Sequence, residues 1–433
     1  MKRQQATFTN LSFSIIKEQL LHWANQYNNC SFLDNHFYPS QLHTYECMVA
    51  VGVCNSFTVE NASSATQLSQ LAHFFNQQSH DWLFGHIGYD FKNALFPTLL
   101  PSKKKHLQFA DLFFYQPQIV VQLFSNYLVI ASINITPSEV FAQICNTQIS
   151  VAETPKVRMA MHGRLSKAAY IEQIQQLQQH ILRGDCYEIN FCQEFYNEQA
   201  VIHPVDVYKQ LTQISPNPFS CFYKQAHNYL LCASPERYIK KQGSVLISQP
   251  IKGTFKRHLT NPIADEQMRS QLLNSEKDKS ENVMVVDLVR NDLSRICERG
   301  SVKVDELFGV YTFPQVHQMI STVSGIVNDS INFADVLGAT FPMGSMTGAP
   351  KCKVMELIDA YEPTARGLYS GAVGYISPDG NFDFNVVIRS LLYNQQTQYL
   401  SYQVGGGITY YSHAESEYEE CLLKAAAIQA VLL

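Results

Sequence analysis

The chain has 433 residues, enough for two or three domains or for one large domain with a substantial hydrophobic core. Charged residues make up only 16%, and 32 basic against 37 acidic side chains leave a formal net charge of −5. This balance excludes the broad basic surface with which proteins hold nucleic acid or anionic membranes nonspecifically. An anionic ligand would have to be bound locally, by a cation, an arginine or the start of a helix.

The cysteines and the apolar runs bear on the cellular compartment. The 11 cysteines are scattered and form no C-x-x-C pair, so we expect buried, reduced thiols rather than disulfides or a thiolate metal site. The first residues contain no continuous apolar segment of the signal-peptide type, and no run approaches the roughly 20 apolar residues of a membrane span. We therefore expect a soluble, cytoplasmic protein that binds neither membrane nor nucleic acid.

The first third of the chain is predicted to consist of short strands separated by Asn, Ser and Pro residues. Examples are 48–53, 82–89 and 119–133. A polar interval, 147–164, is the expected linker to the rest of the chain. Strands in the first third and mixed elements later predict an α+β fold rather than a strictly alternating parallel sheet.

Denser patterns follow the linker. Helices are predicted over 166–183, over 275–297 with Ser275 as its cap, and from about 416 to 433. Strands are predicted over 187–195, by alternation, and over 244–251. A further helix opens at 347–351, where Pro350 stands at an early position that needs no N–H donor.

The last predicted helix carries Glu417, Glu420 and Lys424, whose spacing places them on one face. Just before it, the triple glycine 405–407 follows a strand and would free backbone N–H groups for close approach to an anion. The alternative is a solvated Glu/Lys face beside a flexible turn.

A second acidic pair, Asp278 and Glu281, has the same spacing on the helix at 275–297. Two carboxylate pairs on two helices could hold one hard cation such as Mg²⁺ and leave positions for substrate oxygens. The alternative is that Asp278 and Glu281 are first-turn acids favoured by the helix dipole.

Two further residues could carry chemistry. Lys252 follows a strand directly, and burial or a neighbouring cation would turn its amine into a nucleophile. Glu236, after another apolar strand, could be a general acid, the alternative being an exposed turn residue. His317 and Arg389 stand alone. The sequence has no G-x-S-x-G elbow, no P-loop and no G-x-G-x-x-G, so neither a serine hydrolase nor a nucleotide cofactor is indicated.

Taken together, these segments resemble the chorismate-utilising enzymes, a family that includes anthranilate, aminodeoxychorismate, isochorismate and salicylate synthases. The matching stretches, in the family's order, are 184–190 (GDCYEIN), 234–237 (SPER), 250–254 (PIKGT), 281–293 (ENVMVVDLVRNDL), 347–351 (TGAPK) and 405–409 (GGGIT). The resemblance implies an α+β, anthranilate-synthase component I-like fold of two packed antiparallel β-sheets with outer helices and an active site in the cleft between them. It also implies an N-terminal region at 1–150 and a chorismate-binding catalytic region at 165–433, together forming one compact unit.

The resemblance further assigns roles. It implies Mg²⁺ bound directly by Glu281 and Glu420, with Asp278 and Glu417 behind them through water. It implies substrate carboxylates held by Gly405, Gly407, Tyr369, Arg389 and Lys424, and a ring site lined by Thr254 and His317. Glu236 would help the C4 hydroxyl of chorismate to leave.

Within the family, aminodeoxychorismate synthases carry the lysine corresponding to Lys252, whereas anthranilate synthases usually have alanine there. The resemblance implies that this amine attacks C2 of chorismate to form a covalent adduct, which ammonia resolves at C4. Isochorismate and salicylate synthases have a water-activating lysine near the position of Glu188, so an acid there disfavours the addition of water.

The resemblance also bears on partners and regulation. Because the sequence has no glutaminase elbow, a separate glutamine amidotransferase subunit is the expected source of ammonia. The tryptophan-binding Leu-Leu-Glu-Ser of feedback-inhibited relatives is not clear, 31–35 being the nearest stretch, so we expect no inhibition by tryptophan. Two alternatives stay open: an anthranilate synthase component I that carries Lys252, and an inactive relative that binds chorismate or acts as a scaffold.

Overall fold

The computed structural model describes residues 3–38, 45–78, 80–99, 103–149, 159–314 and 316–432, in which all strands belong to two antiparallel sheets. We call the 12-stranded sheet A and the 10-stranded one sheet B. Sheet A has the order β1 (Gln4–Thr9), β8 (Tyr127–Ser132), β7 (Ile119–Leu123), β3 (Cys47–Val51), β2 (Asn29–Asp34), β11 (Phe219–Gln225), β12 (Asn228–Ser234), β21 (Ser390–Asn394), β22 (Tyr399–Ile408), β10 (Glu188–Asn197) and β18 (Gly348–Ala349), with β9 (His162–Gly163) paired to β10.

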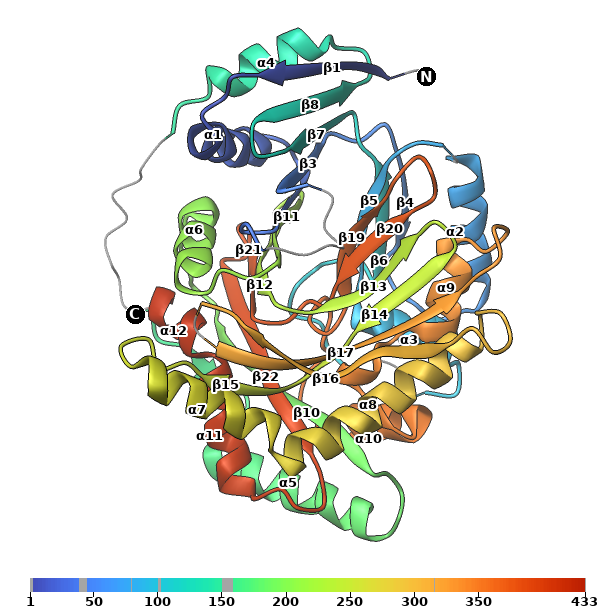
Figure 1. Cartoon of the computed structure of the whole chain (residues 1–433), viewed down its shortest axis with the longest axis vertical. Coiled ribbons are helices and arrows are strands. Elements are labelled where there is room, and N and C mark those ends of the chain that lie inside the picture. Colours follow the sequence, from blue (N-terminus) through green and yellow to red (C-terminus); the bar gives the residue numbers. More distant parts are fainter. Residues whose placement is uncertain are drawn as a thin grey trace.

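Sheet B has the order β15 (Ile251–Lys256), β17 (Val316–Ile326), β14 (Val245–Gln249), β13 (Arg237–Gln242), β20 (Phe382–Asn385), β19 (Ala372–Ile376), β5 (Leu83–Ile87), β6 (Leu112–Gln116) and β4 (Asn55–Val59), with β16 (Lys303–Thr312) paired to β17. Each sheet therefore combines strands from the first third of the chain with strands from the remainder (Figure 1).

Helices pack on the outer sides of the two sheets, as Figure 1 shows. On sheet A these are α1 (Phe13–Asn25), α4 (Pro137–Cys145), α5 (Lys167–Leu182), α6 (Pro204–Ile214), α10 (Lys351–Tyr361), α11 (Ala414–Lys424) and α12 (Ala426–Leu432). On sheet B they are α2 (Thr66–Gln77), α7 (Pro262–Leu273), α8 (Glu276–Ser294) and α9 (Phe333–Thr340), and α3 (Lys92–Leu95) is a single short turn. No helix in the described ranges is long and apolar enough to cross a membrane.

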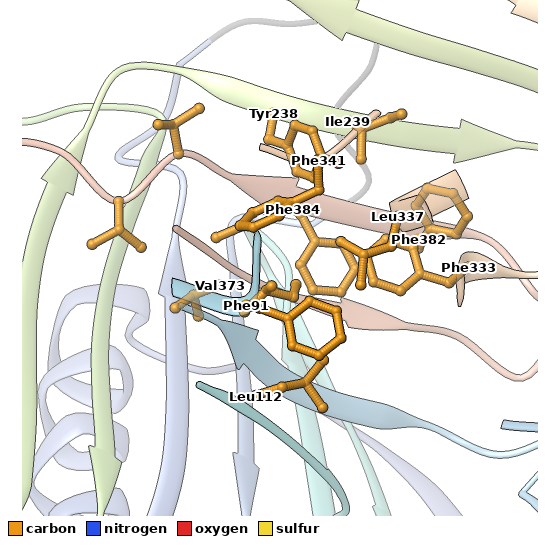
Figure 2. Packing of buried hydrophobic residues seen from close by; sticks show 14 of the residues in the cluster. Phe91, Leu112, Tyr238, Ile239, Phe333, Leu337, Phe341, Val373, Phe382 and Phe384 are labelled. Carbon is orange, nitrogen blue, oxygen red and sulfur yellow. The ribbon is translucent and has the colours of Figure 1, made fainter. Parts of the chain in front are cut away.

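Aromatic side chains dominate the packing of α9 on the outer face of sheet B (Figure 2). Phe333 of α9 stacks on Phe384 of β20, with ring centroids 4.3 Å apart, and meets Phe382 edge-on at 4.8 Å. Aromatic pairs of this kind add to the stabilisation that burial of apolar area provides. Between the sheets, a buried hydrogen bond of 2.9 Å joins the hydroxyls of Ser31 on sheet A and Tyr115 on sheet B.

The α+β fold of two antiparallel sheets is confirmed, and all 11 cysteines are free thiols as predicted. Their predicted burial holds for seven of them, whereas Cys54 and Cys297 are half-buried and Cys145 and Cys352 are exposed. The helix predicted at 166–183 is α5, whose cap Ser166 accepts a hydrogen bond from the Ala169 N–H at 3.2 Å. The helix predicted at 275–297 is α8, capped by Ser275.

Four predictions of local structure are wrong. The first third also contains the helices α1, α2 and α4 in addition to strands. The stretch 119–133 is a hairpin of two strands. The last helix breaks at Ala425 into α11 and α12, and nothing in the residues gives a reason for this break. Glycines 405–407 lie inside β22, not after it. Of the predicted linker, residues 150–158 lie outside the described ranges.

Candidate active site

Lys252 lies on β15, at the end of the strand order of sheet B, and reaches across to sheet A. Its Nζ donates a hydrogen bond to Oε1 of Glu188, the first residue of β10, and the exposures of the two residues are only 9% and 2%. On the neighbouring β22, a Cβ at Gly407 would lie 2.6 Å from Glu188 Oε1 and 2.8 Å from Lys252 Nζ. Position 407 therefore has to be glycine if the lysine and the glutamate are to stay in contact.

Two opposing effects act on the pKa of Lys252. Burial lowers it, but the carboxylates of Glu188, Glu281 and Glu236 together raise it above its ordinary value. From the sequence we expect burial or a neighbouring cation to deprotonate the amine. Lys252 is buried, but the charged groups around it are carboxylates. In these surroundings the amine is an ammonium, and it must give up a proton before it can act as a nucleophile.

Glu236 stands between β12 and β13, where its N–H donates a hydrogen bond to Ser234 Oγ at 3.2 Å. Its side chain is buried, and burial raises the pKa of Glu236 to about 7. A hydrogen bond from Ser345 and the charges of Lys252 and Arg389 offset this effect only in part. A substantial fraction of Glu236 is therefore protonated at neutral pH and can donate a proton, which excludes the alternative of an exposed turn residue.

Arg389 brings a cation next to Glu236. It directly precedes β21, has a positive φ of 51°, and its guanidinium makes no ion pair or hydrogen bond to another residue in the described part of the chain. Burial lowers the pKa of Arg389 to about 10, while Glu236 and Tyr38 act to raise it. Because a desolvated cation is costly without a counter-ion, this position favours the binding of an anionic group.

The acidic residues of α8 and α11 form a second group beside this one. Glu281 and Glu417 are both buried, and among the described residues neither Glu281 Oε1 nor Glu417 Oε2 has a hydrogen-bond partner. Lys277 lies between the two carboxylates, with its Nζ 3.3 Å from Glu417 Oε1 and 3.9 Å from Glu281 Oε1. Burial also raises the pKa of Glu281 to about 7, an effect that the charge of Lys252 reduces.

Glu420 and Lys424 continue along the same face of α11. Lys424 Nζ forms an ion pair of 2.9 Å with Glu420, whose pKa this positive charge lowers, and donates a hydrogen bond of 3.1 Å to the carbonyl oxygen of Gly405. A Cβ at Gly406 would lie 3.2 Å from Glu417 Oε2. Glu417 is therefore packed against the glycines of β22, whereas the side chains of Glu420 and Lys424 are still 43% and 36% exposed, so this face of α11 is partly solvated.

Asp278 contacts both the N-terminal cap of its own helix and the strand that carries Lys252. As the third residue of α8 it accepts a hydrogen bond from the hydroxyl of the cap Ser275, which is the local role that its place in the first turn suggests. Its Oδ1 would lie 2.8 Å from a Cβ at Gly253, a residue of β15 with φ of +88°. Gly253 thus allows β15 and α8 to approach each other beside Lys252.

The donor set of α8 and α11 fits a hard divalent cation, because it consists of carboxylate oxygens and two of them are buried without a partner. No three or more His, Cys, Asp or Glu side chains converge as ligands within the described ranges. Lys277 instead lies between Glu281 and Glu417. Binding of a metal ion therefore requires that the carboxylates close in and that the ammonium move.

Thr254 and His317 are not brought into this group by any hydrogen bond or ion pair between described residues. Thr254 is exposed on β15. His317 is buried and hydrogen-bonded at both ring nitrogens, with Nδ1 3.0 Å from Thr312 and Nε2 3.1 Å from Asp265 of α7. Their predicted role in lining a ring site stays a prediction.

Gly405, on β22, and Tyr369, in the loop before β19, both lie next to Cys192 of β10. A Cβ at Gly405 would lie 2.0 Å from the carbonyl oxygen of Phe191, so this glycine is required for the pairing of β22 with β10. The Tyr369 hydroxyl is 3.6 Å from Cys192 Sγ, and burial raises the pKa of this tyrosine well above its ordinary value. Contacts of either residue with substrate stay predictions.

Two residues of the group were missed in the sequence. In the sequence, Lys277 looks like an ordinary solubilising lysine in the first turn of a helix. Only the packing of α8 beside α11 brings it between Glu281 and Glu417. Ser345, in the short 3-10 turn Gly344–Met346, was missed as well, since nothing in its surroundings marks it as a partner of Glu236.

Residues 34–430 match the family model of the chorismate binding enzymes. The chain therefore belongs to this family. It is 39% identical to "Aminodeoxychorismate synthase component 1" of Salmonella typhimurium over 65% of this chain and 62% of the relative, so it spans less than two thirds of that protein. It is 33% identical to an "Anthranilate synthase component I-like protein" of Synechocystis over 81% of this chain and 72% of that one.

The fold has a counterpart among solved structures. Anthranilate synthase component I of Streptococcus pneumoniae superposes with a TM-score of 0.75 over 91% of this chain and 94% of that chain, at 23% identity. At this identity the likeness establishes the fold, which is the anthranilate-synthase component I-like fold.

Proposed function

We propose that the protein is an aminodeoxychorismate synthase component I, which converts chorismate and ammonia to 4-amino-4-deoxychorismate in para-aminobenzoate and folate biosynthesis. The observation that carries this proposal is the buried Lys252 ammonium in contact with Glu188, with the partly protonated Glu236 beside it. The name of the Salmonella relative supports the same activity.

In the proposed reaction, Lys252 first passes a proton to Glu188, the carboxylate that its ammonium contacts. The amine then bonds to C2 of chorismate as the C4–O bond breaks, and Glu236 protonates the departing hydroxyl so that it leaves as water. Ammonia bonds to C4, its surplus proton returns to Glu236, and the C2–N bond to the lysine breaks. The released amine of Lys252 then takes its proton back from Glu188. Chorismate and ammonia thereby give aminodeoxychorismate and water, and the enzyme is restored.

Mg²⁺ is the proposed cofactor, held directly by Glu281 and Glu420, with Asp278 and Glu417 joined through water. When bound, it supplies positive charge to a substrate carboxylate. The two unpartnered carboxylate oxygens support such a site. Arg389, which has no described counter-ion, and Lys424 would bind the carboxylates of the substrate.

We further propose that ammonia comes from a separate glutamine amidotransferase subunit. The designation "component 1" of the relatives names one part of an enzyme that has more than one. The catalytic residues described above contain no group for releasing ammonia from glutamine, so free ammonium should replace the partner at a lower rate.

The absence of tryptophan inhibition belongs to the same proposal. The stretch 31–35 borders a cavity of about 50 Å³ between the sheets, lined in part by Leu33, Asp34, Tyr45 and Asn385. Pockets for small-molecule ligands usually measure about 300 Å³ or more, so this cavity has room for water rather than for an indole ring.

The experiment that tests the proposed function is a product assay with chorismate, Mg²⁺ and ammonium. We expect aminodeoxychorismate and no pyruvate. Fluorescent anthranilate together with pyruvate would instead identify an anthranilate synthase, the second candidate, which the name of the Synechocystis relative favours. Absence of any chorismate turnover, with chorismate binding retained, would identify an inactive binding or scaffold protein.

A further inference from the structure

Lys277 occupies the space between the two buried carboxylates that α8 and α11 contribute. Its Nζ lies 3.3 Å from Glu417 Oε1 and 3.9 Å from Glu281 Oε1, and the side chain of Glu417 is 2% exposed. Glu417 also accepts a hydrogen bond of 2.7 Å from Ser412 through the same oxygen, which leaves Oε2 without a partner. The lysine is therefore the counter-ion that makes burial of these two acids affordable in the absence of a metal ion.

The same lysine can leave this position. Its side chain is 48% exposed, against 11% for Glu281 and 2% for Glu417, so the ammonium can swing into water while the carboxylates stay in place. A divalent cation that takes the two carboxylates cannot coexist with an ammonium about 3 to 4 Å from the same oxygens, because like charges at that distance repel strongly.

We propose that Lys277 is a resident counter-ion of the cation site, which pairs Glu281 with Glu417 in the metal-free protein and is displaced when Mg²⁺ binds. Metal binding is then an exchange of one cation for another. The apparent affinity for the metal is lower than the intrinsic affinity of the carboxylates, because the ammonium has to leave before the metal binds. This inference rests on the Mg²⁺ site of the proposed function.

The test compares metal binding and stability in variants of the full chain, without chorismate. Lys277→Met keeps most of the apolar stem and removes the charge, and Lys277→Arg keeps the charge. Lys279→Met is the matched control, since Lys279 on the same helix has, among the residues that the structure describes, an ion pair only with the exposed Glu276, at 3.5 Å. Mn²⁺ binding is followed by electron paramagnetic resonance and Mg²⁺ binding by calorimetry. The melting temperature of each variant is measured in EDTA and in saturating Mg²⁺.

We expect Lys277→Met to bind Mn²⁺ about tenfold more tightly than the unmodified protein, to melt at a lower temperature in EDTA and to gain more stability from Mg²⁺. Lys277→Arg and Lys279→Met should keep the original affinity. Equal or weaker Mn²⁺ binding by Lys277→Met would disprove the proposed exchange of cations. If the methionine variant does not fold, the same measurement is made on Lys277→Gln.

The outcomes separate this inference from the proposed function. If chorismate turnover is Mg²⁺-dependent but Lys277→Met leaves the Mn²⁺ affinity unchanged, only the exchange is wrong. If neither the unmodified protein nor any variant binds Mn²⁺ or Mg²⁺, the metal site itself is wrong and the exchange fails with it. If the product is anthranilate, the binding data still decide for or against the exchange.

Discussion

Replacement of Glu236 by glutamine should stabilise the metal-free protein at alkaline pH while abolishing its activity. The carboxyl of Glu236 is fully buried, and burial raises its pKa from 4.5 to about 7. The folded protein thus keeps a proton on Glu236 up to about pH 7, whereas the unfolded chain loses it above about pH 4.5. Stability is therefore lost as the pH rises through this window, and the loss is complete above it.

The size of the effect follows from the same shift. An increase from 4.5 to about 7 corresponds to roughly 3 kcal/mol of stability lost at pH 8, since each tenfold change in proton affinity is worth about 1.4 kcal/mol. Glutamine has nearly the same shape and never ionises, so Glu236→Gln should gain up to about that amount at pH 8 and close to nothing at pH 4.5.

Urea unfolding in EDTA at pH 5 and pH 8 measures this gain. The matched control is Glu356→Gln, because Glu356 is exposed and, within the described part of the chain, pairs only with Lys353 on the same helix, at 3.0 Å. This control should change the free energy of unfolding by less than about 0.5 kcal/mol at either pH. A gain that is the same at both pH values, or that is absent at pH 8, would refute the assignment of Glu236 as a buried acid.

Three further outcomes test the site. Gly407→Ala should reduce turnover by about 100-fold or more with the fold retained, because its methyl group separates Glu188 from Lys252. The control is Gly338→Ala, whose added Cβ would meet the end of the Leu68 side chain. Full activity of the Gly407 variant would disprove the tight contact. Lys252→Ala should abolish the covalent adduct with chorismate in mass spectrometry, and an adduct of unchanged yield would exclude this lysine as the nucleophile. Tryptophan at millimolar concentration should leave the rate unchanged, whereas saturable inhibition would show that the cavity between the sheets opens.

The parts of the fold that could be predicted are those that local chemistry decides. Ser166 and Ser275 cap α5 and α8 as expected, because a hydroxyl that accepts from the third N–H of a helix needs only neighbouring residues. Helix α4 could have been predicted in the same way, since Thr136 and Glu139 form a capping box around Pro137. That signal was present in the sequence and was overlooked.

The parts that could not be predicted depend on partners far along the chain. Three successive glycines favour a turn, yet they lie inside β22. A side chain at Gly405 would meet the backbone of β10, and one at Gly407 would meet the side chains of Glu188 and Lys252. The raised pKa of Lys252 has a similar origin. Its sequence neighbours indicate only that it is oddly placed for a solubilising charge, and the carboxylates that decide its charge, Glu188 and Glu281, come from β10 and α8.

The charges around Lys252 bear on how an acidic protein would bind the dianionic substrate of the proposed function. The candidate site contains six acids, Glu188, Glu236, Asp278, Glu281, Glu417 and Glu420, and four cations, Lys252, Lys277, Arg389 and Lys424. With Glu236 and Glu281 protonated, as pKa values of about 7 allow, the four remaining carboxylates balance the four cations; with both ionised, the site carries an excess of two negative charges. In neither state does the site attract a dianion, so under the proposed function the divalent cation enters first, because it adds the two positive charges that cancel this excess.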